Sequence, residues 1–277
     1  MRQTVLLLLL ALCACGGDRQ AKKALEAAGE IDRNNMADIM QTVADPREAV
    51  SYFTRVTTEQ PDRIDLQRGL AKSLVRNGQP EQGVKVWQKV MTMPGVTNDD
   101  KVSMAEAEIR AGDWKAAQAT LASVPPTHET FDRYRIEAMV ADSNRQWARA
   151  DSFYETAVGL TTRPAGVLNN WGFSKLTRGE PGAAEKLFGQ ALTYDPDNFT
   201  AKNNLVLARA AQRKYELPII EMTQTERSKL LYTAGLSAIK QGDVTIGRGL
   251  LQDAVDTSPV YFDEAQRALD ALDAKRG

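Results

Sequence analysis

Few side chains in this sequence of 277 residues have the types and spacing that catalysis or metal binding requires. The single histidine, His128, follows the run Val124-Pro125-Pro126-Thr127, which is typical of a surface loop. No GxSxG, HExxH, phosphate-binding glycine loop or CxxC pair occurs, so nucleophilic, zinc and nucleotide sites all lack their usual motifs. We therefore expect no enzyme activity, no cofactor and no metal ion.

Asparagine pairs offer a chemistry of recognition instead. They occur at Asn34-Asn35, Asn169-Asn170 and Asn203-Asn204. An asparagine amide both donates and accepts hydrogen bonds, so a row of such amides could hold the backbone of an extended peptide without reading its side chains. Asparagine also serves as an ordinary polar surface residue or positions the start of a helix, and this alternative stays open.

The stretch Ala165–Asn198 predicts the element that must position such side chains. Apolar residues recur three and four apart on both sides of Arg178-Gly179-Glu180-Pro181, which predicts two amphipathic helices joined by a turn. Gly172 and Ala184 are small enough to let the two helices approach closely, and bulky neighbours such as Phe188 would fill the space beside them. The stretch is therefore expected to form an antiparallel helical hairpin.

The same pattern recurs along most of the chain, about every 34 residues. Each copy has a small residue in its first helix and a large residue at a matching position in its second helix. The first series is Ala37, Ala71, Ala105, Ala138, Gly172, Val206 and Gly235, and the second is Phe53, Trp87, Leu121, Tyr154, Phe188, Met222 and Leu251. The two series predict repeats near residues 30–63, 64–97, 98–130, 131–164, 165–198, 199–227 and 228–261, followed by a closing helix within residues 262–277.

Two places depart from the pattern. Glu137 stands where other repeats carry an apolar or small residue, which predicts loose packing in the fourth repeat. The sixth repeat is about five residues short, and Pro218 falls inside its second helix, so a bent or shortened helix is expected over Tyr215–Thr225. The shortened repeat either re-aims the last hairpin or is a decayed copy.

In length, and in the small residues at its eighth, twentieth and twenty-seventh positions, the unit resembles the tetratricopeptide repeat (TPR). The resemblance implies an all-α fold: a right-handed α-solenoid of about seven helical hairpins with a C-terminal capping helix. In TPR proteins the first helices line a concave groove that binds protein partners, and Arg68, Lys72 and Arg76 would make the second repeat of that groove basic. The groove-facing residues carried over are Asn34, Asn35, Arg68, Lys72, Asn169, Asn170, Phe173, Asn203, Asn204, Leu207, Tyr232 and Leu236.

The first residues resemble an export signal. Arg2 precedes an apolar run over residues 5–12, which is shorter than the roughly 20 residues that a membrane-spanning helix needs. Leu12-Cys13-Ala14-Cys15 resembles a bacterial lipobox, so we expect a signal peptide over residues 1–14, a lipid on Cys15 and a flexible tether over residues 15–29. By resemblance to enterobacterial sorting rules, Gly16 implies attachment to the outer membrane, facing the periplasm. An ordinary signal cut near Ala14 is the alternative.

Composition narrows the range of partners. The formal net charge is −1, with 26% charged residues of both signs. A nucleic-acid binder would need a basic excess to contact phosphates, so we expect no nucleic-acid partner. Both cysteines lie within the first fifteen residues, so no disulfide or cysteine-based metal site is expected further along.

An exported, lipid-tethered TPR chain most resembles the TPR lipoproteins of Flp/Tad pilus assembly. The resemblance is carried by Cys15-Gly16-Gly17, the asparagine-rich first helices, the shortened repeat, and the segment Ser258-Pro259-Val260-Tyr261 after the last repeat's helices. It implies an outer-membrane scaffold that binds the secretin or other envelope-assembly components. The alternatives are an adaptor for outer-membrane protein insertion or peptidoglycan-synthesis complexes, a periplasmic substrate-binding protein with a closed pocket, and an enzyme.

Overall fold

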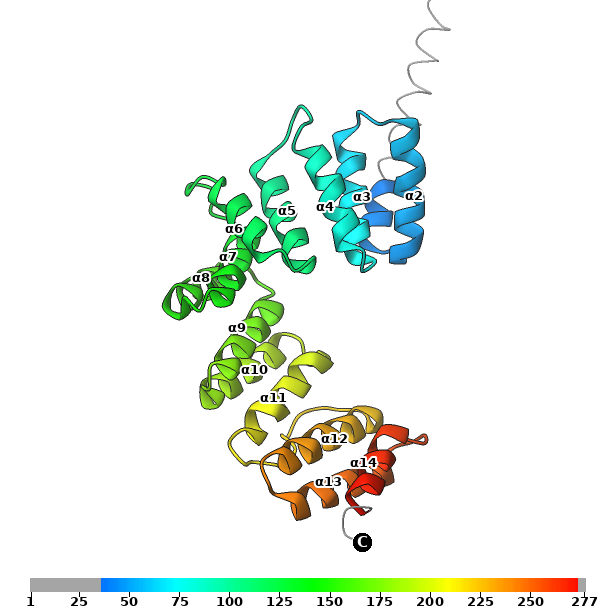
Figure 1. Ribbon diagram of the computed structural model, residues 1–277, viewed down its shortest axis with the longest axis vertical. Coiled ribbons are helices and arrows are strands. Elements are labelled where there is room, and N and C mark those ends of the chain that lie inside the picture. The colour runs from blue at the N-terminus through cyan, green and yellow to red at the C-terminus, as the bar shows by residue number, and fades with distance from the viewer. Residues whose placement is uncertain (1–35, 274–277) are drawn as a thin grey trace, which may run out of the picture. The chain divides into compact units, whose positions relative to one another are not determined.

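The computed structural model describes residues 36–273, and every regular element within that range is an α-helix (Figure 1). The expected all-α fold is thereby confirmed. The predicted signal peptide, Cys15, the tether and the pair Asn34-Asn35 lie outside the described residues. The chain divides into two compact units, one ending at Pro125 and the other beginning at Pro126.

The first unit is a series of antiparallel helices that starts with a helical segment over residues 36–42. Its further helices are α2 (Pro46–Glu59), α3 (Ile64–Arg76), α4 (Pro80–Val90), α5 (Asn98–Arg110) and α6 (Trp114–Ala122). Local sequence sets several helix starts. Asp45 caps α2 by accepting a hydrogen bond from the Arg47 N–H at 2.9 Å, and Thr97 with Asp100 forms a reciprocal capping box at α5.

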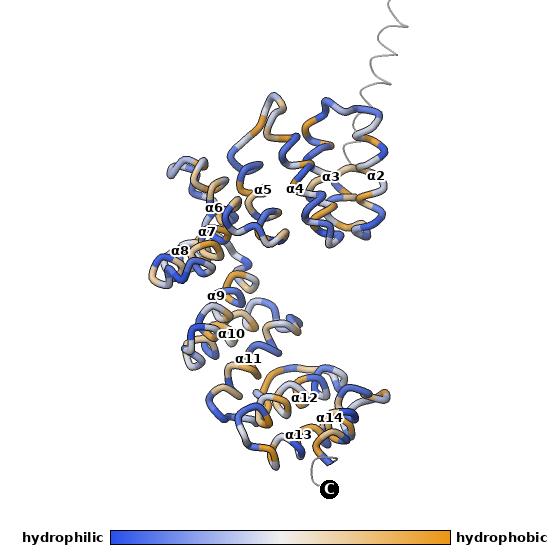
Figure 2. Tube along the Cα trace, in the orientation of Figure 1, coloured by the Kyte–Doolittle hydropathy of each residue, from blue (hydrophilic) through white to orange (hydrophobic). Residues whose placement is uncertain are grey.

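The second unit carries most of the candidate groove residues. Its helices are α7 (Phe131–Ser143), α8 (Trp147–Gly159), α9 (Ala165–Thr177), α10 (Pro181–Tyr194), α11 (Phe199–Ala210), α12 (Gln224–Lys240), α13 (Val244–Thr257) and α14 (Asp263–Asp273). Three pairs form helical hairpins, namely α7 with α8, α9 with α10, and α12 with α13. Apolar and polar residues alternate along each helix, as the hydropathy colours in Figure 2 show. This alternation lets one side of a helix pack while the other meets water.

Most residues of the two series lie in the core of the hairpins, whereas Met222 lies in the loop after α11 and is partly buried. The small residues from Ala71 to Gly235 are buried, and among the large ones Phe53, Trp87, Tyr154, Phe188 and Leu251 are at most 2% exposed. Close approach explains the small series, because a Cβ on Gly172 would lie only 2.6 Å from Cε1 of Phe188. The predicted pairing of a missing side chain with a bulky neighbour is confirmed at this crossing.

The prediction of loose packing around Glu137 is wrong. Glu137 is 9% exposed, and its Oε1 accepts a hydrogen bond from Nε of Arg133 at 2.8 Å. Arg133 is itself buried and also donates to the carbonyl oxygens of Pro126 and His128. The polar residue is tolerated because a partner one helical turn away meets its charge.

The prediction of a bent or shortened helix over Tyr215–Thr225 is also wrong. After α11 ends at Ala210, residues 211–223 form a loop, and the next helix begins only at Gln224. Pro218 has no N–H to donate and disfavours helical geometry at the residue before it, so a second helix cannot propagate through this segment. Among the described helices of the second unit, α7, α9 and α12 are each followed by the second helix of a hairpin. α11 is followed by a loop instead.

Candidate interaction surface

The asparagine pairs of the second unit tie neighbouring first helices to one another. Nδ2 of Asn204 on α11 donates to Oδ1 of Asn169 on α9 at 2.9 Å. Thr233 on α12 donates from Oγ1 to Oδ1 of Asn203 at 2.8 Å. Nδ2 of Asn170 lies 4.0 Å from Sδ of Met139 on α7. These contacts join α7, α9, α11 and α12 in sequence order.

These hydrogen bonds between helices use only some of the donors and acceptors of each asparagine amide. Asn204 is 8% exposed and is therefore chiefly a structural residue. Asn169 and Asn203 are half-buried, and within the described residues their Oδ1 atoms accept the ties while their NH₂ groups have no partner. These two amides can still donate hydrogen bonds to a bound chain.

Four apolar residues occupy the same repeat position in the first helices of the second unit. We call them the apolar row: Met139 on α7, Phe173 on α9, Leu207 on α11 and Leu236 on α12. Phe173 is 51% exposed and Leu236 is 39% exposed, while the other two are partly exposed. The sequence prediction missed Met139, although it stands 34 residues before Phe173 and the repeat period alone would have found it.

Tyr232 lies in the middle of α12 and is only partly exposed. Its ring packs against the ring of Phe262, with 5.3 Å between the ring centroids. Tyr232 thus packs against the segment that leads into α14.

The basic residues predicted for the second repeat lie in the first unit, and two of the three have partners there. Arg68 contacts the Asp100 carboxylate through Nε at 2.6 Å and Nη2 at 2.5 Å. Arg76 donates to the backbone carbonyls of Gln41 and Ala44. Lys72 is exposed. The surface of this repeat is therefore less basic than its composition implies.

Electrostatics agree with a stable pair between Arg68 and Asp100. Burial acts to raise the pKa of Asp100, but hydrogen bonds from Arg68 and Thr97 outweigh it, and the pKa is lowered. The hydrogen bond to Asp100 raises the pKa of Arg68. Both groups stay ionised, and their charges cancel locally.

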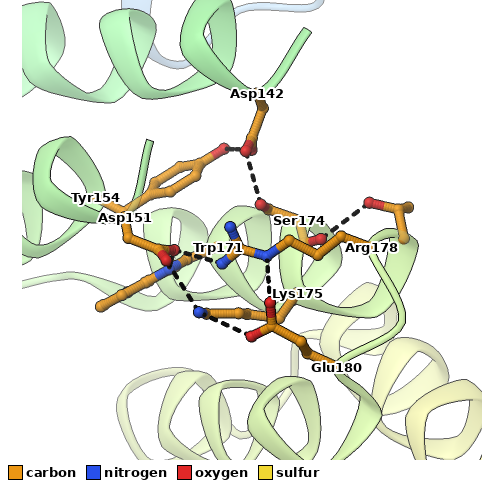
Figure 3. A network of polar contacts seen from close by, with 9 residues as sticks. Asp142, Asp151, Tyr154, Trp171, Ser174, Lys175, Arg178 and Glu180 are labelled. Carbon is orange, nitrogen blue, oxygen red and sulfur yellow. Dashed lines mark hydrogen bonds and ion pairs between the residues drawn. The ribbon is translucent and has the colours of Figure 1, made fainter. Parts of the chain in front are cut away.

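A network of polar side chains fastens the hairpin α7/α8 to the hairpin α9/α10 (Figure 3). At one end is Asp142, near the end of α7. Its Oδ2 accepts from the Tyr154 hydroxyl at 2.8 Å, and its Oδ1 accepts from the Ser174 hydroxyl at 2.7 Å. Burial raises the pKa of Asp142, and it also raises the pKa of Tyr154, together with the adjacent Asp142 charge.

At the other end is Asp151 on α8, which gathers three donors from α9 and its turn. Its carboxylate accepts from Nε1 of Trp171 at 2.6 Å, Nζ of Lys175 at 3.0 Å and Nη2 of Arg178 at 2.5 Å. The Arg178 side chain is 4% exposed and also forms an ion pair with Glu180. Burial opposes ionisation of Asp151, but these donors outweigh it and lower the pKa.

Every charge in this network has a partner inside the fold, so its chemistry is that of a structural clasp. Tyr154 stacks on Trp171 with ring centroids 6.1 Å apart, and Arg178 lies over the Trp147 ring at 5.5 Å. Within residues 36–273 no group of His, Cys, Asp and Glu has an arrangement that could hold a metal ion. The described helices also include none long and apolar enough to cross a membrane.

Comparisons with known proteins identify the fold. Residues 170–217 match the family model described as a tetratricopeptide repeat. No curated protein matches the chain.

Three solved structures illustrate the likeness. A chain of the APC/C hetero-tetramer Cut9–Hcn1 matches 84% of this chain with a TM-score of 0.61 and 12% identity, and this chain spans 47% of that one. A tetratricopeptide repeat protein from Parabacteroides merdae matches 92% of this chain and 98% of its own, with a TM-score of 0.53 and 10% identity. The pilF protein of Pseudomonas aeruginosa matches 75% and 97%, with a TM-score of 0.51 and 14% identity.

At these identities the solved structures show the fold alone. Together with the matched segment, they define the class of the protein: an all-α chain built from TPR-type helical hairpins. TPR folds commonly bind protein partners along the surfaces of their stacked helices, and the apolar row lies on the first helices of the second unit.

Proposed function

We propose that this chain is a non-catalytic scaffold that binds a protein partner along the first helices of its second unit. The observation that carries the proposal is the apolar row, in which Phe173 and Leu236 are exposed. The nearby NH₂ groups of Asn169 and Asn203 have no partner among residues 36–273. Apolar side chains supply burial on binding, while the amides orient a backbone. An extended or helical segment with spaced apolar residues fits this chemistry.

We further propose that the scaffold is a lipoprotein of the cell envelope, anchored through Cys15 to the outer membrane and facing the periplasm. The support for this is the sequence of the first residues and the resemblance to the TPR lipoproteins of Flp/Tad pilus assembly, whose partners include a secretin. Replacing Cys15 with Ala should abolish labelling by a fatty-acid probe and release the protein from membrane fractions. Unchanged labelling would rule out Cys15 as the anchor.

Photo-crosslinking tests partner binding. A photoreactive amino acid is placed at Phe173 or at Leu236 in the full chain, and Tyr194, which is 59% exposed at the end of a second helix, serves as the matched control. We expect one common protein to crosslink from the first two positions and not from Tyr194, with mass spectrometry identifying it. Equal crosslinking from all three positions would contradict a surface confined to the first helices.

Charge substitution then tests whether the apolar row supplies affinity. Phe173→Asp and Leu236→Asp should each weaken partner capture by about tenfold or more, because a buried apolar anchor contributes on the order of 1–2 kcal/mol. Thermal unfolding should change less than partner capture does, since Phe173 and Leu236 are 51% and 39% exposed. Full retention of the partner by the double variant would exclude the apolar row as the binding site.

A further inference from the structure

Residues 211–223 occupy the place where a second helix would follow α11, and we call them the connecting loop (Figure 1). Several side chains of the connecting loop pack against the helices of the second unit. Tyr215 is 7% exposed and its hydroxyl donates to Oδ2 of Asp243 at 2.5 Å. Leu217, Ile220 and Met222 pack against the apolar clusters of the unit. An ordered loop can present its outer residues at fixed positions.

The outermost of these residues is Ile219. Its exposed fraction is 106%, although it lies between the partly buried Pro218 and Ile220. Earlier in the same loop, three residues together with the start of α13 line a surface pocket of about 340 Å³. The pocket is lined by Arg213, Tyr215, Glu216, Asp243, Ile246 and Leu250. An apolar projection and a partly apolar hollow thus stand on one loop.

Net charge along the connecting loop has opposite signs on the two sides of Ile219. Before it, Arg213 and Lys214, with side chains 62% and 49% exposed, outnumber the single exposed Glu216. Glu221 follows it, is exposed, and has no partner within the described residues. Arg213 and Lys214 do contact Asp243 and Glu185, but ion pairs this exposed contribute little and can rearrange.

We infer that the connecting loop is a self-association surface whose partner is a second copy of this chain. Around a two-fold axis the same segment of two copies runs antiparallel, and each copy offers the other an identical patch. Seating Ile219 of one copy in the pocket beside Tyr215 and Glu216 of the other brings Glu221 next to Arg213 and Lys214. The exposed Ile219, the pocket and the opposite charges complement one another within a single loop. Such self-complementarity is what a two-fold contact between identical chains requires, and a different protein does not require it. This inference is independent of partner binding by the apolar row.

Sedimentation equilibrium of the full chain, in a density-matched detergent, tests the inference. The mass should rise from monomer toward dimer with concentration. Ile219→Asp should weaken dimerisation by about a hundredfold, because the substitution removes one anchor from each half of a symmetric interface. Val260→Asp, at a residue 70% exposed outside the connecting loop, is the matched control and should leave dimerisation unchanged. A mass that stays monomeric, or a dimer that Ile219→Asp does not weaken, would overturn the inference.

Charge exchange tests the antiparallel arrangement itself. Lys214→Glu and Glu221→Lys should each weaken the dimer, since each places like charges opposite one another. The double variant should recover most of the lost association, because the opposite charges face each other again. Single variants without effect, or a double variant as weak as the single ones, would overturn the proposed pairing. Lys214 and Glu221 are both exposed, and the ion pair of Lys214 with Glu185 is partly solvated, so these changes should alter the free energy of unfolding by no more than about 1 kcal/mol, which urea unfolding of each variant checks.

Discussion

Single side chains in this protein divide between holding helices together and remaining available to a ligand. Asn204 illustrates the first role, because its amide is nearly buried and bonds to Asn169. Phe173 illustrates the second, since half of its surface is in solvent. The sequence predicted both as groove residues because they occupy equivalent faces of first helices. It could not distinguish them, since the partner of Asn204 lies 35 residues away on another helix.

The close approach at Gly172 gives a test of packing. Gly172→Ala should lower the free energy of unfolding by about 1–3 kcal/mol, because the added methyl group meets the Phe188 ring. Gly189, in the middle of α10, is the matched control because nothing lies within 4 Å of an added Cβ. Gly189→Ala should instead stabilise by up to about 1 kcal/mol through helix propensity. Urea unfolding followed by circular dichroism measures both, and equal effects would refute the packing argument.

The two carboxylates of the clasp should respond to pH with opposite signs. The pKa of Asp151 is lowered in the fold, so its stabilisation is present above the usual aspartate range and is lost as pH falls through the lowered value. Asp151→Asn should therefore cost about 1–3 kcal/mol at neutral pH, because it leaves the buried Arg178 short of a partner, and less in acid. Denaturant unfolding across pH measures this difference. A cost independent of pH would contradict the ionic role.

Asp142 supplies the control for that experiment. Its pKa is raised, so the stability it contributes is present below the usual aspartate range and is lost as pH rises through the raised value. As pH rises, the free energy of unfolding of the Asp142→Asn variant should increase relative to that of the native protein. That of the Asp151→Asn variant should decrease relative to the native protein. Parallel pH profiles for the two variants would contradict these assignments.

At the scale of elements, helical hairpins were predictable wherever the small and large residues kept their period. Gly172 and Phe188 are predicted and found in contact, because close helix packing leaves few other solutions. The sixth repeat has no second helix around Pro218, where the sequence indicated a bent or shortened one. The clasp was not predicted at all. Asp142 meets Tyr154 and Ser174, which lie 12 and 32 residues further along, and no local pattern marks such a contact.

A buried ion pair links α11 to α12, in addition to the hydrogen bond between Asn203 and Thr233. Nζ of Lys202, whose side chain is 2% exposed, lies 3.1 Å from Oε1 of Glu226, which also caps α12 together with Thr223. Glu226→Gln keeps a capping side chain but removes the charge, and should cost about 2–3 kcal/mol because a buried ammonium group loses its partner. Lys202→Met in the same chain should restore most of the loss in urea unfolding. Failure of this second change to restore stability would place the cost in the cap instead.

At the scale of the whole molecule, the division after Pro125 predicts that the second unit folds by itself. Its apolar clusters draw only on residues of that unit. Residues 126–277 expressed alone should unfold cooperatively, and Gly172→Ala should lower the melting temperature of the fragment as much as that of the full chain. Calorimetry of both proteins provides the measurement. A fragment without a cooperative transition would show that the units depend on each other.

The clasp has a consequence for how such a chain can change by recombination. Loss of residues 165–198 would bring the next repeat into their place, and Asn204 would then stand where Asn170 meets Met139. The clasp would not survive, because Leu205 and Ala208 would replace Trp171 and Ser174 opposite the two aspartates. Asp142 and Asp151 of the fourth repeat would then lose hydrogen-bond donors that the fifth repeat now supplies. The fourth and fifth repeats therefore have to stay adjacent in this order. Duplication or deletion of other repeats should be tolerated better than a change at this junction.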